Sequence, residues 1–225
     1  MDPIEILYRS HDLLICVKPA GVLSQSGTSG QKSMISLLES QTGCRVYPVH
    51  RLDREVGGVM VYALSRTAAG NLSQQIQSGQ MVKEYLAVTN GIPPQSEGLL
   101  TDLLFHDRVR NKTYVVDRKR KGVKEARLMY RVLETSQSQS LIHVRLLTGR
   151  THQIRVQFAS RGTPLSGDGK YGGGSGPLLL WAFGLTLDLP GAERNRFTAI
   201  PSKLGSFLVP FAPETLNLKK DENNS

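Results

Sequence analysis

The densest group of reactive side chains lies in one decapeptide, Val49-His50-Arg51-Leu52-Asp53-Arg54-Glu55-Val56-Gly57-Gly58. It places the carboxylate of Asp53 between the guanidinium groups of Arg51 and Arg54. Neighbouring positive charge favours an ionised carboxylate, which is the form that acts as a nucleophile or general base. The apolar run of residues 59–64 follows directly and predicts a buried strand. We therefore expect Asp53 to lie at the edge of a rigid element.

A second dense segment, Thr148-Gly149-Arg150-Thr151-His152-Gln153-Ile154-Arg155, lies far along the chain. Its arginines are candidates for pairing with Asp53, because a buried carboxylate needs a partner to keep its charge. Residues 151–161 show a helical pattern, with Ile154 and Phe158 on one face. The alternative for Arg155 is therefore an ordinary surface position on this helix.

These two segments together resemble the RluA family of RNA pseudouridine synthases. His50-Arg51-Leu52-Asp53 leads through glycines into an apolar strand, and Thr-Gly-Arg-Thr-His-Gln-Ile-Arg follows at residues 148–155. Three further segments agree in order and spacing: Val17-Lys18-Pro19-Ala20-Gly21, Lys83-Glu84-Tyr85-Leu86-Ala87 and Gly167-Asp168-Gly169-Lys170-Tyr171-Gly172. The five matches span roughly residues 7 to 190.

The resemblance implies a cofactor-free isomerase that converts uridine in structured RNA to pseudouridine, with ribosomal RNA favoured over transfer RNA. Asp53 matches the family's catalytic aspartate, which stabilises charge at C1′, attacks C1′ or removes a proton from the neighbouring sugar carbon. Arg155 matches its ion-pair partner, and Tyr85 matches a tyrosine that stacks on the target uracil. An isolated strand tyrosine would more often be ordinary core packing.

The same motifs supply residues for RNA contacts. Arg51 resembles the arginine that fills the gap left by the flipped base, with an ion pair to Glu55 as the alternative. Lys83 and Arg150 are assigned to RNA binding by their motif positions. The sequence leaves His50, His152 and Asp168 as scaffold residues, and five histidines without clustered thiols or carboxylates give a metal site little support.

The charge of the chain is concentrated in one segment. The formal net charge is +9 and the pI is about 9.7, which indicates a polyanionic partner. Residues 108–127 hold nine basic and two acidic residues, and thus most of the net charge. We assign RNA backbone contacts within it to Arg118, Lys119, Arg120 and Lys121. A solvated polar loop is the alternative.

Strand-type patterns outnumber helical ones and show no βαβ rhythm, which predicts an α+β domain. We expect a single catalytic domain over residues 1–214, a mainly antiparallel mixed sheet with flanking helices and an RNA-binding cleft. Residues 215–225 read as a polar, disordered tail, and the early first strand leaves no room for a separate N-terminal RNA-binding domain. Strands are predicted over 178–187 and 205–209, and a helix after Ser65 that ends at Gly79.

Two departures from the family pattern involve residues near the motifs. Relatives usually have Thr-Ser-Gly where this chain has Val56-Gly57-Gly58, and His-Ala where it has Trp181-Ala182. Neither changes Asp53 or Tyr85. They indicate a divergent subgroup, so the identity of the substrate uridine does not carry over.

Composition points to a cytoplasmic monomer without a membrane segment. Two cysteines make no disulfide framework, and there is no run of ~18 apolar residues. Two other functions stay open. One is an RNA-binding or ribosome-assembly factor on the same fold. The other is a glycosidic hydrolase that uses Asp53 and Glu55 as paired carboxylates.

Overall fold

The chain forms two compact units in the computed structural model, which describes residues 2–26, 32–189 and 195–201. The first unit contains Met1–Tyr85, Arg145–Leu147 and Leu180–Pro201. The second contains Leu86–Val144 and Thr148–Leu179. The division falls inside strand β5 (Val82–Asn90), directly after Tyr85.

The first unit is built on strand β4 (Gly57–Ala63), in which every residue is buried. Strand β2 (Leu13–Lys18) runs antiparallel to β4 on one side, and β10 (Leu180–Thr186) runs parallel to it on the other. Three short strands complete this part of the sheet: β1 (Ile6–Arg9) beside β2, β3 (Tyr47–Pro48) beside β4, and β11 (Arg196–Thr198) beside β10. A strand buried on both faces needs the continuous apolar run that the sequence has here.

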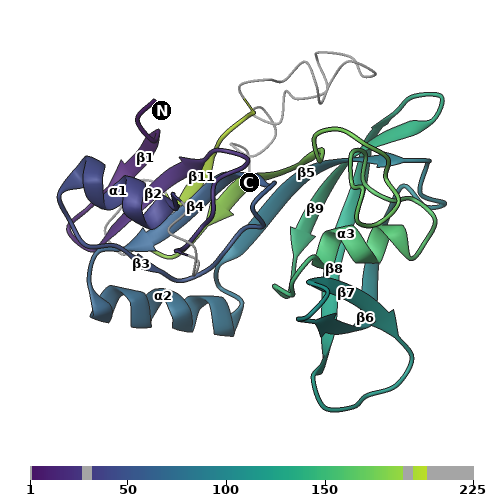
Figure 1. Ribbon diagram of the computed structural model, residues 1–225, viewed down its shortest axis with the longest axis horizontal. Helices are drawn as coiled ribbons and strands as arrows, with labels where there is room; N and C mark the ends of the chain where they lie inside the picture. Colours follow the sequence, from purple (N-terminus) through teal and green to yellow (C-terminus); the bar gives the residue numbers. More distant parts are fainter. Residues whose placement is uncertain (1, 27–31, 190–194, 202–225) are drawn as a thin grey trace, which may run out of the picture. The chain divides into compact units, whose positions relative to one another are not determined.

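Two helices in the first unit begin and end at the residues that helix chemistry favours. Helix α1 (Met34–Thr42) starts after Ser33, and helix α2 (Arg66–Ser78) starts after Ser65, whose hydroxyl accepts a hydrogen bond from the amide of Ala68. Each helix is followed by a glycine with positive φ, which is 76° for Gly79. Helix α2 contacts β4 and buries Leu72 in the main core of this unit (Figure 1).

The second unit is an antiparallel array in which β6 (Glu97–Asp107) pairs with both β7 (Lys112–Val116) and β8 (Val123–Thr135). Beyond β8 the strand order continues through β9 (Gln139–Leu146) to β5. The short helix α3 (Gln153–Ala159) contacts β6 and β7 (Figure 1). Leu104, Ala126 and Val156 form a buried cluster there.

The observed elements agree with an α+β fold that has a mixed, mostly antiparallel sheet and few helices. Strand β6 was not predicted, and α3 begins at Gln153 because His152 adopts a left-handed conformation with φ of 53°. The predicted strand over 205–209 and the tail lie outside the described residues. The boundary of one catalytic domain at residue 214 stays a prediction. Within the described ranges, no helix is long and apolar enough to cross a membrane.

Candidate active site

The loop that carries Asp53 is held by one buried hydroxyl. Ser24 accepts a hydrogen bond from the amide of Leu52 at 3.0 Å and donates to the carbonyl of the same residue at 2.8 Å. The carbonyl of Ser24 in turn accepts from the hydroxyl of Tyr62, a fully buried residue of β4. Because both backbone groups of Leu52 are bound to one side chain, the residue just before Asp53 is fixed against the sheet.

A buried lysine holds the other side of this loop. Lys18, at the end of β2, is fully buried and donates to the carbonyls of Pro19 at 2.9 Å and Arg54 at 3.1 Å. Burial lowers its pKa to about 8, against the opposing effect of the negative charges of Glu55 and Asp53. The sequence marked Lys18 only as part of a motif. Its polar contacts with the Asp53 loop depend on the fold and were not predicted.

Tyr85 lies near Asp53 in the first unit. Its side chain on β5 is only 7% exposed. Burial raises the pKa of its phenol, and the negative charge of Asp53 raises it further. The charge of Asp53 therefore acts on this phenol, while the catalytic roles of the two residues stay predictions. The phenol of Tyr85 stays protonated at neutral pH.

His50 is part of the scaffold of the same loop. Its Nε2 accepts a hydrogen bond of 3.1 Å from the amide of Val61 in β4. Burial lowers its pKa to about 3, and the positive charge of Lys83 acts in the same direction. An imidazole that accepts from an amide must be neutral at that nitrogen, so the proton resides on Nδ1. This agrees with the predicted scaffold role and places Lys83 within electrostatic range of the loop.

Arg51 and the two glycines have distinct environments. Arg51 is exposed, and the ion pair with Glu55 that the sequence left open is not formed between these two described residues. Gly57 lies against Trp181 of β10, and a Cβ at Gly57 would overlap the indole ring. Gly58 has a φ of 124° and lies against the backbone of Ala182.

In the second unit, Arg155 forms a buried bidentate ion pair with Asp168. Its Nε and Nη2 each lie 2.7 Å from a carboxylate oxygen, and the side chains are 6% and 0% exposed. The guanidinium also lies over the ring of Tyr171, 5.3 Å from its centre. The alternative interpretation, in which Arg155 is an ordinary surface residue of the helix, is therefore wrong. Pairing with Asp53 stays a prediction, because Asp53 belongs to the other unit.

A hydrogen-bond network fixes the surroundings of this ion pair. The hydroxyl of Tyr171 accepts from the amide of Thr113 at 2.8 Å and pairs with Nδ1 of His152 at 2.9 Å. The hydroxyl of Thr113 donates to the carbonyl of Thr151 at 2.9 Å. Gly167, with φ of 77°, begins the tight turn that presents Asp168. The predicted scaffold roles of His152 and Asp168 agree with these contacts.

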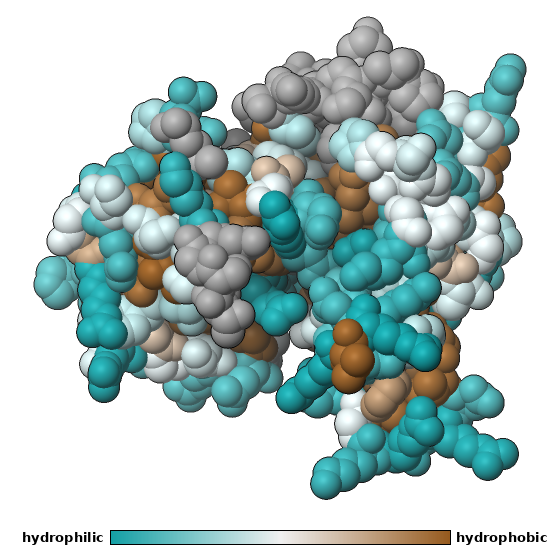
Figure 2. Space-filling model, viewed as in Figure 1, coloured by the Kyte–Doolittle hydropathy of each residue, from teal (hydrophilic) through white to brown (hydrophobic). Residues whose placement is uncertain are grey.

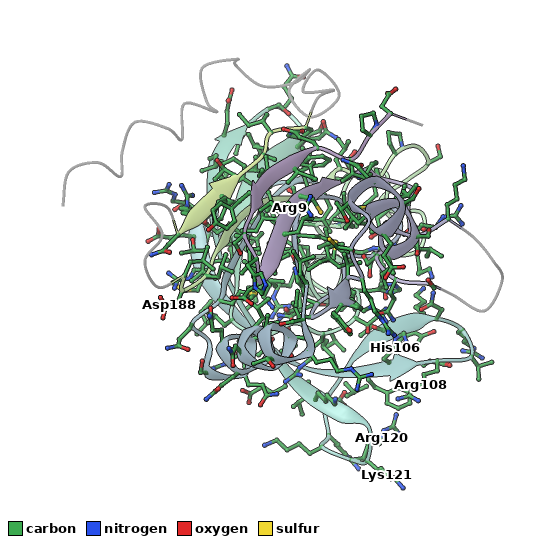
Figure 3. All side chains as sticks on the ribbon, turned by 90° about the vertical axis from the view of Figure 1, so that its left-hand side faces the viewer. Arg9, His106, Arg108, Arg120, Lys121 and Asp188 are labelled. Carbon is green, nitrogen blue, oxygen red and sulfur yellow. The ribbon has the colours of Figure 1, made fainter. Side chains whose placement is uncertain are left out.

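The remaining RNA-binding candidates lie at the surface of the second unit. Hydrophilic side chains gather around the free end of β6 and β7 (Figure 2). Arg118, Lys119, Arg120 and Lys121 are all exposed in the loop that joins β7 to β8, and Figure 3 shows Arg120 and Lys121 at its outer end. Arg120 lies over the ring of Phe105 at 5.0 Å. Arg150 donates from Nε to the carbonyl of Glu125 at 2.9 Å.

In the part of the chain that the structure describes, no three histidine, cysteine, aspartate or glutamate side chains lie grouped so that they could hold a metal ion. The reactive groups of the site are instead one carboxylate, one phenol and several cations. That set suits acid, base and nucleophilic chemistry on an anionic substrate.

Comparison with known families identifies the class of protein. The chain belongs to the RNA pseudouridylate synthase family, whose model matches residues 12–160. This confirms the resemblance seen in the sequence motifs. The match covers the Asp53 loop, Tyr85 and helix α3.

Individual relatives agree with this membership. The chain is 34% identical to an uncharacterised RNA pseudouridine synthase of Bacillus subtilis, over 76% of this chain and 59% of that protein. It is 38% identical to one of Aquifex aeolicus, over 76% and 56% of the two chains. A ribosomal large subunit pseudouridine synthase D of Nitrosomonas europaea is 35% identical, over 76% and 50%. The chain thus spans a little over half the length of the first two of these relatives.

Solved structures share the fold. The human RNA pseudouridylate synthase domain containing 4 matches with a TM-score of 0.74 over 89% of each chain, at 24% identity. The human RNA pseudouridylate synthase domain containing 1 matches with a TM-score of 0.76 over 94% of this chain and 91% of that one, at 23% identity. The predicted α+β fold is confirmed.

Proposed function

We propose that this protein is a cofactor-free RNA pseudouridine synthase with Asp53 as its catalytic carboxylate. The observation that carries the proposal is the environment of Asp53. The carboxylate stands on a loop bound by buried Ser24 and Lys18, and its charge acts on the buried phenol of Tyr85. A rigid support of this kind is what catalysis requires of a reacting group.

The reaction breaks the N1–C1′ bond of a uridine, turns the uracil and joins C5 to C1′, while the C5 proton leaves and N1 gains one. The target nucleotide must leave the base stack to reach a protein side chain. Asp53 then stabilises positive charge at C1′, attacks C1′ or removes the neighbouring sugar proton, and these three roles remain open. Tyr85 lies against the uracil, and its protonated phenol can exchange a proton with the base.

Arg155 completes the proposed site as the ion-pair partner of Asp53. Asp168 binds both Nε and Nη2 of Arg155, and this bidentate ion pair fixes the orientation of the guanidinium. Asp168 is then a positioning residue. The exposed side chain of Arg51 enters the gap left by the flipped base, and Lys83 and Arg150 contact the RNA backbone.

We propose ribosomal RNA as the substrate in preference to transfer RNA. Several relatives are named as ribosomal large subunit pseudouridine synthases, including those of Nitrosomonas europaea and Buchnera aphidicola, at 35% and 31% identity. The exposed basic loop at 118–121 suits a large folded RNA with closely spaced phosphates.

The deciding experiment measures release of tritium from RNA labelled at uracil C5. Purified protein is incubated with ribosomal and transfer RNA fractions in parallel, and the products are digested to identify pseudouridine. We expect release from ribosomal RNA with wild-type protein, and a loss of at least about a thousandfold in rate with Asp53→Asn. Release with Asp53→Asn at the wild-type rate would contradict the proposal.

A matched control separates this reaction from glycosidic hydrolysis. Glu55 is exposed and two residues from Asp53, so Glu55→Gln removes the other carboxylate of the hydrolase alternative. The synthase proposal expects nearly unchanged tritium release and no free uracil. If wild-type protein instead releases free uracil, and both Asp53→Asn and Glu55→Gln abolish that release, the protein is a glycosidic hydrolase. Salt-sensitive RNA binding without tritium release from any fraction would favour the binding-factor function.

A further inference from the structure

A cavity of about 540 Å³ opens in the second unit, and neither Asp53 nor Tyr85 is among its lining residues. Its wall is formed by the end of β6, the turn after it, the start of β8 and the loop before α3. Ligand pockets in proteins typically measure ~300–1,000 Å³, so this one is large enough for a single nucleotide.

The cavity is lined by three cations, Arg108, Lys124 and Arg150, and by one carboxylate. That carboxylate, Asp107, accepts from the amides of Val109 and Arg110 at 2.9 and 3.0 Å. It is therefore engaged in holding the turn. Figure 3 shows Arg108 at this turn near His106, while Lys121 projects from the outer end of the next loop.

Two of the cations are fixed in direction by the fold. Lys124 is the register partner of Leu104 across β6 and β8, so their side chains share one face of the sheet. On this same face, two residues further along, lies buried Ala126. Arg150 is held by the hydrogen bond from its Nε to the carbonyl of Glu125, which leaves its Nη groups for other contacts. The fold therefore places Lys124 and Arg150 at the cavity.

Part of the cavity lining is apolar or aromatic. Leu104 is buried, and the ring of His106 stands edge-on to that of His152 at 6.1 Å. Phe105 lines the cavity too and is half-buried. Apolar and aromatic side chains beside three cations suit a ligand with a flat ring at one end and negative charge at the other. A lone phosphate would leave the apolar part of the lining uncovered.

We infer that this cavity binds one unpaired nucleotide of the RNA substrate other than the uridine that is modified. Its base enters against Leu104 and His106, and its phosphates are contacted by Arg108, Lys124 and Arg150. The inference rests on the proposed function for RNA as the ligand, but not on catalysis by Asp53. It implies that the enzyme prefers RNA with an extrahelical nucleotide in addition to the target uridine.

The test measures fluorescence anisotropy of two labelled RNA duplexes that differ only by one bulged adenosine, which cannot be isomerised. Stacking of a base on a protein surface contributes enough for roughly a tenfold preference, which we expect wild-type protein to show for the bulged duplex. Arg108→Gln and Lys124→Gln should remove this preference. Their matched controls, Arg110→Gln and Lys121→Gln, lower the charge equally outside the cavity lining and should weaken both duplexes equally.

Each other outcome overturns the inference in a distinguishable way. Equal binding of the two duplexes by wild-type protein would remove the nucleotide site while leaving tritium release untouched. If the cavity variants and the control variants change binding of the two duplexes equally, Arg108 and Lys124 make only general contacts with the RNA backbone. Tight binding of free uridine 5′-monophosphate without bulge preference would assign a mononucleotide site. Binding of a labelled polyglutamate peptide that Lys124→Gln abolishes, again without bulge preference, would assign an acidic protein segment.

Discussion

Lys18 supports the loop that carries Asp53, the proposed catalytic carboxylate, through contacts with the backbone. Its ammonium is fully buried and donates to two backbone carbonyls, one of which belongs to Arg54, the residue after Asp53. Burying a cation costs free energy, and two carbonyl oxygens offset only part of that cost. The lowered pKa of Lys18, about 8, is the signature of this imbalance.

The free energy of unfolding should therefore depend on pH through Lys18. Below pH 8 the amine is protonated in the folded and unfolded states, and between about 8 and 10.5 only the unfolded chain keeps the proton. Stability rises with pH where the unfolded state binds more protons. Across this range, the free energy of unfolding of wild-type protein should rise by up to about 3 kcal/mol relative to that of Lys18→Met, as measured by urea denaturation.

Lys121→Met provides the control, since this lysine is exposed. Its stability difference from wild type should stay constant over the same pH range. A Lys18→Met difference that is equally flat would mean that the buried amine does not titrate in this window.

Strands β4 and β10 explain the two departures from the family pattern as one packing change. They run parallel with Gly57 opposite Trp181, and the indole occupies the space that a Cβ at Gly57 would need. The indole also donates from Nε1 to the carbonyl of Ala199 at 2.8 Å, which fixes the ring. Serine at position 57 beside the smaller histidine ring at position 181 would fill the same volume as Gly57 beside the larger indole of Trp181.

A double-mutant cycle tests this coupling. Gly57→Ser alone should reduce the free energy of unfolding by about 2 kcal/mol, because overpacking forces the fixed indole to move. In the background of Trp181→His the same serine should cost about 1 kcal/mol or less, which gives a coupling energy of ~1 kcal/mol in denaturant titrations. Additive effects of the two substitutions would show that Gly57 and Trp181 vary independently.

Local patterns predicted the elements that local chemistry controls. Ser65 and Gly79 mark α2 because capping depends on neighbouring backbone groups. Strand β6 was missed because its leucines come in adjacent pairs, Leu99-Leu100 and Leu103-Leu104, which disguise the period of two. One member of the first pair is exposed while the other is buried, and this depends on pairing with β8, which is distant in the sequence.

The candidate site shows the same difference between local motifs and long-range contacts. Motifs in the sequence suggest Asp53, Tyr85 and Arg155 as site residues, and their catalytic roles stay predictions. The contacts that hold the Asp53 loop could not be predicted, since Ser24 and Leu52 are 28 residues apart and Lys18 and Arg54 are 36 apart. No local pattern shows which of the many serines and lysines becomes buried against a given carbonyl.

The distribution of charge over the whole chain leads to the last prediction. The net charge is +9, and four of the cations stand consecutively in the exposed loop at Arg118–Lys121. If all four contact phosphates, replacing them by glutamine should reduce the slope of log affinity against log salt by about 3, since each contact releases ~0.7–0.9 counterion. Anisotropy titrations with ribosomal RNA fragments over a range of KCl concentrations give the slope.

A control with Arg9, Arg45, Arg66 and Arg131 replaced by glutamine has the same net charge, and these four residues are also exposed. Equal slopes for the two variants would mean that total charge, and not the loop, determines binding, whereas a smaller slope for the loop variant alone would locate the phosphate contacts in the loop between β7 and β8.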